Sequence, residues 1–247
     1  MPQSTVIVRR FGSRAELDAA LIQRLELAIT APAGSGAGGS GGSAGGRSGA
    51  SGNGGWAIML SGGHTPMPAY RELASRSPRP AAGLSVLFSD DRYVPSTATA
   101  SNYHQSLALI DALALPESSV LRVRTELPLE AAAADYERRI DALLLAGARF
   151  RLGLLGLGAD GHTASLFSSK DVERSRGHRA IAVDRPDGMQ AVSVTPEVLA
   201  HFSELVFIVA GQDKHNAVQS LINRDPALPA FRAIESRTAT DLWLADT

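Results

Sequence analysis

Short, uninterrupted apolar runs are the feature that most restricts the fold of this chain. Residues 205–209 read LVFIV and residues 152–155 read LGLL, with no polar residue at alternate positions. Such runs are typical of strands that are buried on both faces, as in parallel sheets. Because helical patterns separate them along the chain, the sequence predicts a three-layer α/β fold: a mostly parallel sheet with helices on both faces. In such Rossmann-like folds, ligands bind at the carboxyl ends of the strands.

The individual elements follow from apolar periodicity and from the turn residues between them. We predict strands at residues 5–8, 56–60, 85–88, 120–123, 152–155, 181–183, 191–194, 205–209 and 241–244. We predict helices at residues 14–31, 66–75, 102–113, 129–146 and 214–222. This alternation continues along nearly the whole chain, which indicates a single α/β domain spanning residues 1–247.

One segment departs from the pattern. Residues 33–55 are rich in glycine, serine and alanine and hold half of the 24 glycines. Nothing in the segment offers enough apolar area to offset the entropy lost on ordering. Only about 32 residues precede it, too few for a stable domain, so we predict a flexible surface insert within one domain. The segment is too long and repetitive for a phosphate-binding loop, and no helix start follows it directly.

Composition and charge exclude several classes of protein. The 24 basic and 25 acidic residues give a net charge of −1 and no electrostatic reason to expect a nucleic acid or an anionic membrane as a partner. The absence of cysteine excludes a disulfide scaffold, a thiolate zinc site and a cysteine nucleophile. No apolar run reaches the roughly 18 residues that a membrane helix needs, and no signal-peptide pattern opens the chain. We therefore expect a soluble, cytoplasmic protein.

The first motif with chemical potential is LSGGHTP at residues 60–66, between a strand and a helix. Thr65 is a suitable N-cap and Pro66 a suitable first helical residue. Gly62 and Gly63 let the backbone approach a ligand, and the helix N-terminus then presents free N–H groups to an anion. The alternative is a tight turn that needs glycine only for its dihedral angles.

The second motif, FSDDRYVP at residues 88–95, is followed by Ser101 and Asn102. Asp90, Asp91 and Arg92 leave the end of a strand, where a sheet edge meets a crevice. The alternative is a solvated acidic turn with a local ion pair, which contributes less than about 1 kcal/mol.

The third motif is LGLGADGHTASLF at residues 155–167, where a strand enters a glycine-rich turn followed by an expected helix start. A histidine at a strand end with a carboxylate nearby, here His162 with Asp160, is the combination that a general base requires. The alternative is a structural or solvated histidine. Gly156-x-Gly158 lacks the spacing of a dinucleotide site.

The fourth motif is AGQDK at residues 210–214, again at a strand end that turns into a helix. Lys214 can reach a phosphate from the first helical turn, or it is a solvated surface lysine. The remaining histidines have no metal-site spacing, and no G-x-S-x-G nucleophile elbow is present.

Taken together and in this order, the four motifs resemble the family of 6-phosphogluconolactonases and glucosamine-6-phosphate isomerases, over about residues 56–246. The resemblance implies a three-layer α/β fold shared with ribose-5-phosphate isomerase, and an enzyme that uses no metal and no organic cofactor. It implies that His162 is the general base, with Asp160 beside it, and it matches Arg92 to the family's DER segment. Backbone N–H groups and Arg92 are candidates to stabilise the oxyanion that forms in such a reaction. The substrate-binding residues that the resemblance implies are Ser61, Gly62, Gly63, Thr65, Asp90, Asn102, Gly161 and Lys214.

The chain departs from the family pattern at three places. Asp91 replaces a usual glutamate, and His64 replaces a common serine. An arginine that the family often carries is missing from residues 189–195. Phosphate binding is therefore expected to depend on Lys214, on the 62–65 loop or on another arginine such as Arg185.

The resemblance implies hydrolysis of 6-phospho-D-glucono-1,5-lactone to 6-phospho-D-gluconate in the oxidative pentose phosphate pathway. The expected partner is this small sugar-phosphate lactone, with no nucleic acid or membrane, and the expected assembly is a monomer or a small homo-oligomer. One alternative is a glucosamine-6-phosphate isomerase or deaminase, in which DGH precedes an Asn-Glu-Pro element, whereas Leu166, Phe167 and Ser168 follow here. The other is a non-catalytic sugar-phosphate-binding domain, although no basic recognition helix precedes residue 56.

Overall fold

The computed structural model describes residues 4–30 and 54–245. The predicted insert at 33–55 lies outside the described residues, except for its last two glycines. The carbonyl of Gly55 accepts a hydrogen bond from the amide of Arg149. The amide of the next residue, Trp56, donates to the carbonyl of Gly83. These bonds anchor the chain where it enters the sheet.

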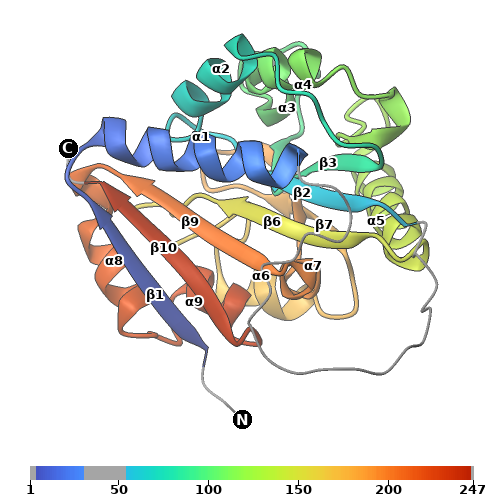
Figure 1. The fold of residues 1–247 in the computed structure, drawn as a ribbon. Helices are drawn as coiled ribbons and strands as arrows, with labels where there is room; N and C mark the ends of the chain where they lie inside the picture. Colours follow the sequence, from blue (N-terminus) through green and yellow to red (C-terminus); the bar gives the residue numbers. More distant parts are fainter. Residues whose placement is uncertain (1–3, 31–53, 246–247) are drawn as a thin grey trace, which may run out of the picture.

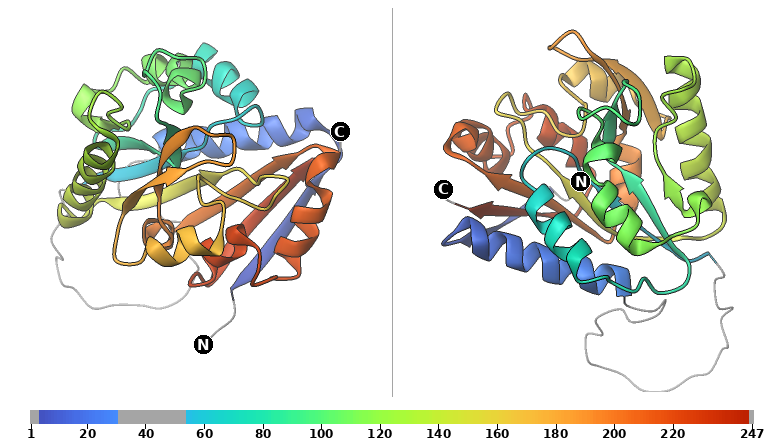
Figure 2. Two further views of the ribbon diagram at one scale, coloured as in Figure 1. Left: turned by 180° about the vertical axis from the view of Figure 1, so that it is seen from behind. Right: turned by 90° about the horizontal axis from the view of Figure 1, so that it is seen from above.

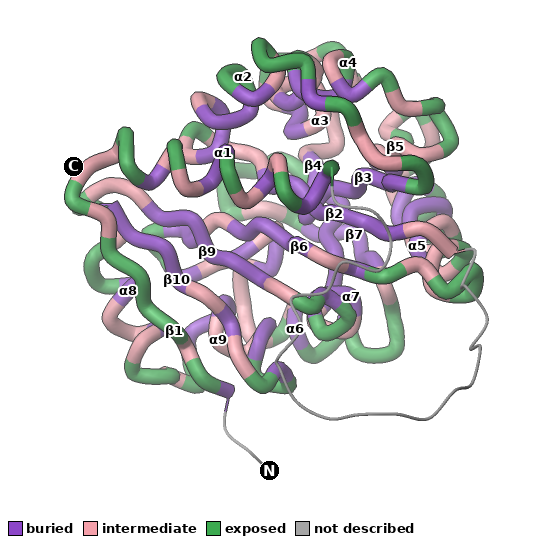
Figure 3. Tube along the Cα trace, in the orientation of Figure 1, coloured by how far each residue is buried: buried purple, intermediate pink, exposed green. Residues whose placement is uncertain are grey.

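A seven-stranded sheet forms the centre of the molecule (Figure 1), and every neighbouring pair of its strands is parallel. From one edge to the other, the strands are β1 (Thr5–Phe11), β10 (Ala239–Ala245), β9 (Glu204–Ala210), β6 (Arg149–Leu155), β2 (Trp56–Leu60), β3 (Leu84–Phe88) and β5 (Val120–Leu121). The central strands are buried along most of their length, whereas β1 is largely exposed (Figure 3).

Helices cover both faces of this sheet, so the predicted three-layer arrangement is confirmed. One face carries α1 (Arg14–Thr30), α2 (Met67–Ser75), α3 (Asn102–Gln105) and α4 (Leu107–Leu113). The other carries α5 (Leu129–Leu145), α6 (Ser169–Arg174), α7 (Pro196–His201), α8 (His215–Ile222) and α9 (Pro229–Ile234), as the two views of Figure 2 show. Successive residues of β2 enter different cores: Ile58 packs with α1 and α2, and Met59 with the opposite layer.

A second, three-stranded sheet is antiparallel and joins β4 (Asp90–Arg92), β8 (Gln190–Val194) and β7 (Ala180–Asp184) in that order. The strands predicted at 181–183 and 191–194 therefore exist, and they form a hairpin that packs against α5. β4 was not predicted because three polar residues carry no strand pattern. Its pairing with β8 fixes the backbone of the DDR segment.

Several helix predictions differ from the structure in their details. The helix predicted at 102–113 is two helices, because the Ser106 hydroxyl donates to the Asn102 carbonyl and competes with the backbone at the break. No helix begins directly after His162; the next one starts at Ser169, with Ser168 as its N-cap. Thr65 does not cap α2, whose N-cap position is Pro66. The short helices α6, α7 and α9 are too brief to give a periodic signal.

Candidate active site

A cavity of about 400 Å³ opens at the carboxyl ends of β2, β6 and β9, beside β4. All four sequence motifs contribute to its wall, as expected for loops that leave parallel strands at the same edge. Of the predicted site residues, only Asp160 and Gly161 are not part of the lining. Those that line the cavity are Ser61, Gly62, Gly63, Thr65, Asp90, Arg92, Asn102, His162 and Lys214.

His162 and Asp160 form a close pair on the turn after β6. The Nδ1 atom of His162 lies 2.5 Å from Oδ1 of Asp160, which also accepts the backbone N–H of His162 at 3.2 Å. Burial acts to raise the pKa of Asp160, but the charge and hydrogen bonds of His162 outweigh it and hold that pKa below its ordinary value. When Asp160 accepts the Nδ1 hydrogen, Nε2 is the ring nitrogen that can take up a proton.

The glycines of this turn make the pair possible. A Cβ atom on Gly158 would lie 2.1 Å from His162 Nδ1 and 2.3 Å from Asp160 Oδ1, so no larger residue fits there. Gly161 has a φ of +84°, which favours glycine, and its amide donates to the Gly158 carbonyl. The Gly156 carbonyl accepts the hydroxyl of Thr163 at 2.9 Å. The glycine pattern therefore shapes the loop around His162.

Phe167 packs against His162, and Arg185 packs in turn against Phe167. The ring of Phe167 lies 4.4 Å from the His162 ring, measured between centroids. The guanidinium of Arg185 lies 5.1 Å from the Phe167 ring, and it pairs with Asp187 at 2.9 Å. Arg185, one of the expected alternatives for phosphate binding, thus lies behind Phe167 and is not part of the cavity lining.

Asp90 and Asp91 of the DDR segment are buried and hydrogen-bonded, which contradicts the alternative of a solvated acidic turn. Asp91 is 2% exposed and accepts hydrogen bonds from the Ser101 hydroxyl, the Asn102 amide and the Tyr103 amide. Burial raises the pKa of Asp91 to about 6 against these hydrogen bonds. Asp91 therefore joins the loop after β4 to the start of α3.

Asp90 and Arg92 point to the other side of the β4 strand from Asp91. Asp90 accepts the hydroxyl of Ser165 at 2.7 Å, which links the DDR segment to the His162 loop. Arg92 donates to Asn102 Oδ1 at 2.5 Å and to the carbonyl of Ala100 at 3.0 Å. These bonds hold the guanidinium of Arg92 at the cavity wall.

The LSGGHTP loop packs directly on Asn102. A Cβ atom on Gly62 would lie 1.8 Å from Asn102 Oδ1, so the contact requires glycine. The Tyr70 hydroxyl of α2 donates to the Ser61 carbonyl and accepts the Ser61 amide. Among the described residues, the buried Ser61 hydroxyl oxygen has no hydrogen-bond partner, so it can bond to a ligand in the cavity.

The opposite wall carries Lys214 at the end of a 3₁₀ turn, η2 (Gln212–Lys214), after β9. Its ammonium group lies 3.3 Å from Asp213, which also lines the cavity. His64 lines the cavity as well, although sequence reasoning noted it only as a departure from the family pattern. Its position inside the LSGGHTP loop was the signal that could have identified it.

Comparison with known proteins is consistent with this geometry. Residues 47–243 match the family model described as glucosamine-6-phosphate isomerases/6-phosphogluconolactonase. The chain belongs to this family. The 6-phosphogluconolactonase of Thermotoga maritima is 33% identical over 178 residues, which cover 70% of this chain and 77% of that protein. The 6-phosphogluconolactonase of Synechocystis is 34% identical over 203 residues, covering 76% of this chain and 81% of that protein.

Solved structures show the same fold. A crystal structure of the Thermotoga maritima 6-phosphogluconolactonase aligns with 99% of this chain and 100% of its own, with a TM-score of 0.73 and 24% identity over that longer alignment. A monomeric glucosamine-6-phosphate deaminase aligns with 97% of each chain at a TM-score of 0.73 and 15% identity. The fold alone therefore does not distinguish the two activities of the family.

Across residues 4–30 and 54–245, no three His, Asp or Glu side chains gather in a group that could hold a metal ion. Over the same residues, no helix is long and apolar enough to cross a membrane.

Proposed function

We propose that this protein hydrolyses 6-phospho-D-glucono-1,5-lactone to 6-phospho-D-gluconate, with His162 as the general base. The observation that carries the proposal is the His162–Asp160 pair at the wall of a cavity that also presents Arg92 and Lys214. The relatives named above as 6-phosphogluconolactonases support the choice of substrate.

The reaction requires a proton acceptor next to the attacking water. Asp160 orients the imidazole through Nδ1, so Nε2 takes a proton from water as the oxygen attacks C1 of the lactone. The tetrahedral intermediate then breaks its bond between C1 and the ring oxygen. His162 returns the proton to that oxygen, and the products are a carboxyl group, which ionises, and a free hydroxyl.

Arg92 is the residue we assign to the oxyanion that forms on C1. Asn102 and the Ala100 carbonyl hold its guanidinium in place before the substrate arrives, and such preorganised donors lower the barrier most effectively. We assign the substrate phosphate to Lys214 and the 62–65 loop, together with the unpartnered hydroxyl of Ser61. Anchoring the phosphate orients the distant lactone carbon towards His162. Asp90, Asn102 and Gly161 shape this site through the contacts described above.

The rival activity within the family is the isomerisation and deamination of glucosamine 6-phosphate. In this chain Phe167 stacks on His162, at a place where sequence reasoning expects the rival enzymes to carry an Asn-Glu-Pro element. A cytoplasmic location, and a monomeric or small homo-oligomeric state, stay predictions.

A coupled assay tests the proposal. Glucose-6-phosphate dehydrogenase generates the lactone in place, and 6-phosphogluconate dehydrogenase reports the product. We expect the wild-type chain to accelerate product formation above spontaneous hydrolysis, and the His162→Asn variant to lose most of that gain. Release of ammonia from glucosamine 6-phosphate, with no acceleration of lactone hydrolysis, would favour the rival activity.

A further inference from the structure

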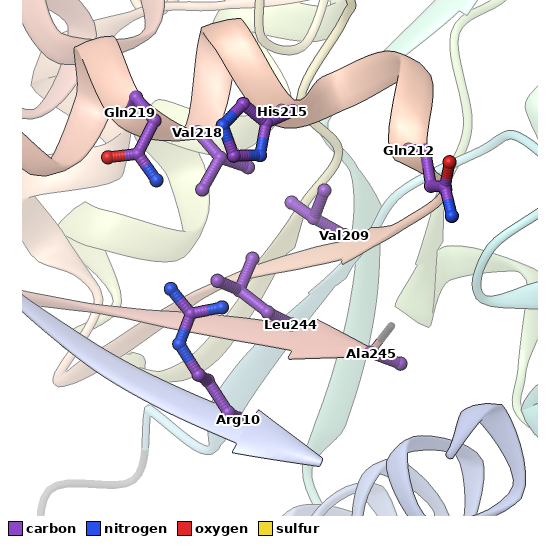
Figure 4. A pocket seen from close by; sticks show the side chains of 9 residues that line it. Arg10, Val209, Gln212, His215, Val218, Gln219, Leu244 and Ala245 are labelled. Carbon is purple, nitrogen blue, oxygen red and sulfur yellow. The ribbon is translucent and has the colours of Figure 1, made fainter. Parts of the chain in front are cut away.

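A second cavity, of about 410 Å³, lies beside the catalytic one, at the carboxyl ends of β1, β10 and β9 and next to α8 (Figure 4). The side chains of Val209, Val218 and Leu244 form its floor, and each of these residues is less than a tenth exposed. Its volume lies within the range of about 300–1,000 Å³ that small-molecule sites occupy. None of the predicted site residues lines it.

The rim of this cavity is polar and carries positive charge. Figure 4 shows Arg10 of β1 extending towards α8, from which His215 and Gln219 project, while Gln212 lies at the turn after β9. In the described part of the chain, none of these four side chains has a hydrogen-bond or ion-pair partner. No described residue of the lining is acidic. The cavity therefore offers one permanent positive charge, an imidazole and two amides to an incoming group.

The combination of rim and floor selects a particular ligand chemistry. A planar guanidinium binds a carboxylate through two parallel hydrogen bonds, and the amides can satisfy its remaining lone pairs. The apolar floor favours a carbon chain, because burying apolar area is favourable. A polyhydroxylated sugar phosphate would place hydroxyl groups against this floor without partners, which is costly. The catalytic substrate is thus a poor fit for this cavity.

A single short turn separates the two cavities. Gln212 faces the second cavity, whereas Asp213 and Lys214, the next two residues, line the catalytic one. Val209 is the shared wall beneath the turn. We propose that the cavity next to Arg10 is a separate, non-catalytic binding site for a small carboxylate with an apolar carbon chain. This inference does not depend on the lactonase function.

Calorimetric titration with hexanoate tests the proposal, since hexanoate joins one carboxylate to a short apolar chain. Hexanamide has nearly the same shape without the charge, and acetate has the charge without the chain. We expect saturable binding of hexanoate, with hexanamide and acetate weaker by about tenfold or more, because each lacks one of the two interactions.

Neighbouring arginines of β1 supply a matched pair of variants. Arg10 faces the cavity, whereas Arg9 points to the opposite face of the sheet and lies over the Trp243 ring. Both residues are exposed, so neither substitution endangers the fold, and both change the net charge equally. We expect Arg10→Ala to weaken hexanoate binding by about tenfold to a hundredfold, the value of a charge-assisted hydrogen bond, and Arg9→Ala to leave it within about twofold.

Two results would overturn the proposal. One is an equal loss of affinity in Arg9→Ala and Arg10→Ala, which would mean that hexanoate responds to net charge alone. The other is loss of hexanoate binding in Lys214→Ala while Arg10→Ala still binds, which would place hexanoate in the catalytic cavity. A tryptophan at position 219 would fill the second cavity from α8. The proposal is supported if Lys214→Ala still binds hexanoate and Gln219→Trp does not.

Discussion

On the β4 side of the cavity, Asp90, Asp91 and Asn102 are buried and hydrogen-bonded, whereas the β9 side presents Lys214 on a short turn with one ion pair. Asp90, Asp91 and Arg92 are fixed by partners from the His162 loop and from the start of α3. Within residues 4–30 and 54–245, the ammonium of Lys214 pairs with the exposed Asp213 alone. A fixed wall suits groups that act on the reacting atoms, because stabilising a transition state requires exact placement. A flexible lysine ammonium suits a phosphate, because the attraction between the two charges depends little on their relative orientation.

The largest expected effect concerns His162, whose loop is bonded to Asp90 of the fixed wall through Ser165. We expect His162→Asn to lower kcat by about a hundredfold or more with little change in KM, because it removes a general base and leaves the binding groups in place. Steady-state kinetics of the folded variant in the coupled assay measures both constants. Nearly normal kcat in this variant would exclude His162 as the base.

The second largest expected effect is that of Arg92→Ala, which distinguishes a role at the oxyanion from a role at the phosphate. If Arg92 stabilises the oxyanion, activity on the phosphorylated lactone and on unphosphorylated gluconolactone should fall alike, by about a hundredfold, the cost of losing one oxyanion donor. Measurement of kcat/KM on both substrates gives the ratio. If activity falls only on the phosphorylated lactone, Arg92 binds the phosphate. The two walls of the cavity would then not differ in function.

Lys214→Ala should show the opposite pattern. We expect kcat/KM for the phosphorylated lactone to fall by about tenfold to a hundredfold through KM, and activity on gluconolactone to change much less, since that substrate carries no phosphate. Lys170→Ala is a matched control, because Lys170 lies exposed on α6 outside the cavity. Equal losses on both substrates would show that the phosphate binds elsewhere.

The last expected effect is on stability and concerns Asp91. Because burial raises its pKa from 3.8 to about 6, the folded protein binds more protons than the unfolded chain between these values. Stability should therefore fall as pH rises from about 4 to about 6, by at most about 1.4 kcal/mol per pH unit. Denaturant unfolding at several pH values measures this slope. Asp91→Asn should flatten it, and an unchanged slope in this variant would assign it to other groups.

Sequence reasoning predicted that the four motifs lie together because each follows an apolar strand, and parallel strands bring their carboxyl ends to one edge. It placed nearly all the proposed site residues at one cavity for that reason. It did not identify the partners that fix them. Ser165 bonds to Asp90 and Ser193 to the Ser165 amide through the pairing of β4 with β8, and neither contact has a local signature.

The same limit applies to the second cavity. Arg10 and His215 are far apart in sequence and meet only because β1 pairs with β10 at the sheet edge beside α8. Nothing in the TVIVRRF pattern distinguishes Arg10 from Arg9 until the faces of the sheet are known. Tertiary packing brings the residues of this cavity together, so the periodicity of the sequence could not predict it.

The pairing of β1 with β10 also has a consequence for biosynthesis. During synthesis β1 is made before every other described strand, and its only sheet partner within the described residues is β10, where Thr5 pairs with Ala239. At about 5–20 residues per second, β1 waits roughly ten to fifty seconds for that partner. During this time Ile7 and Val8, which are exposed even in the finished fold, belong to an unpaired strand. β1 is therefore open to premature strand pairing until β10 has been made.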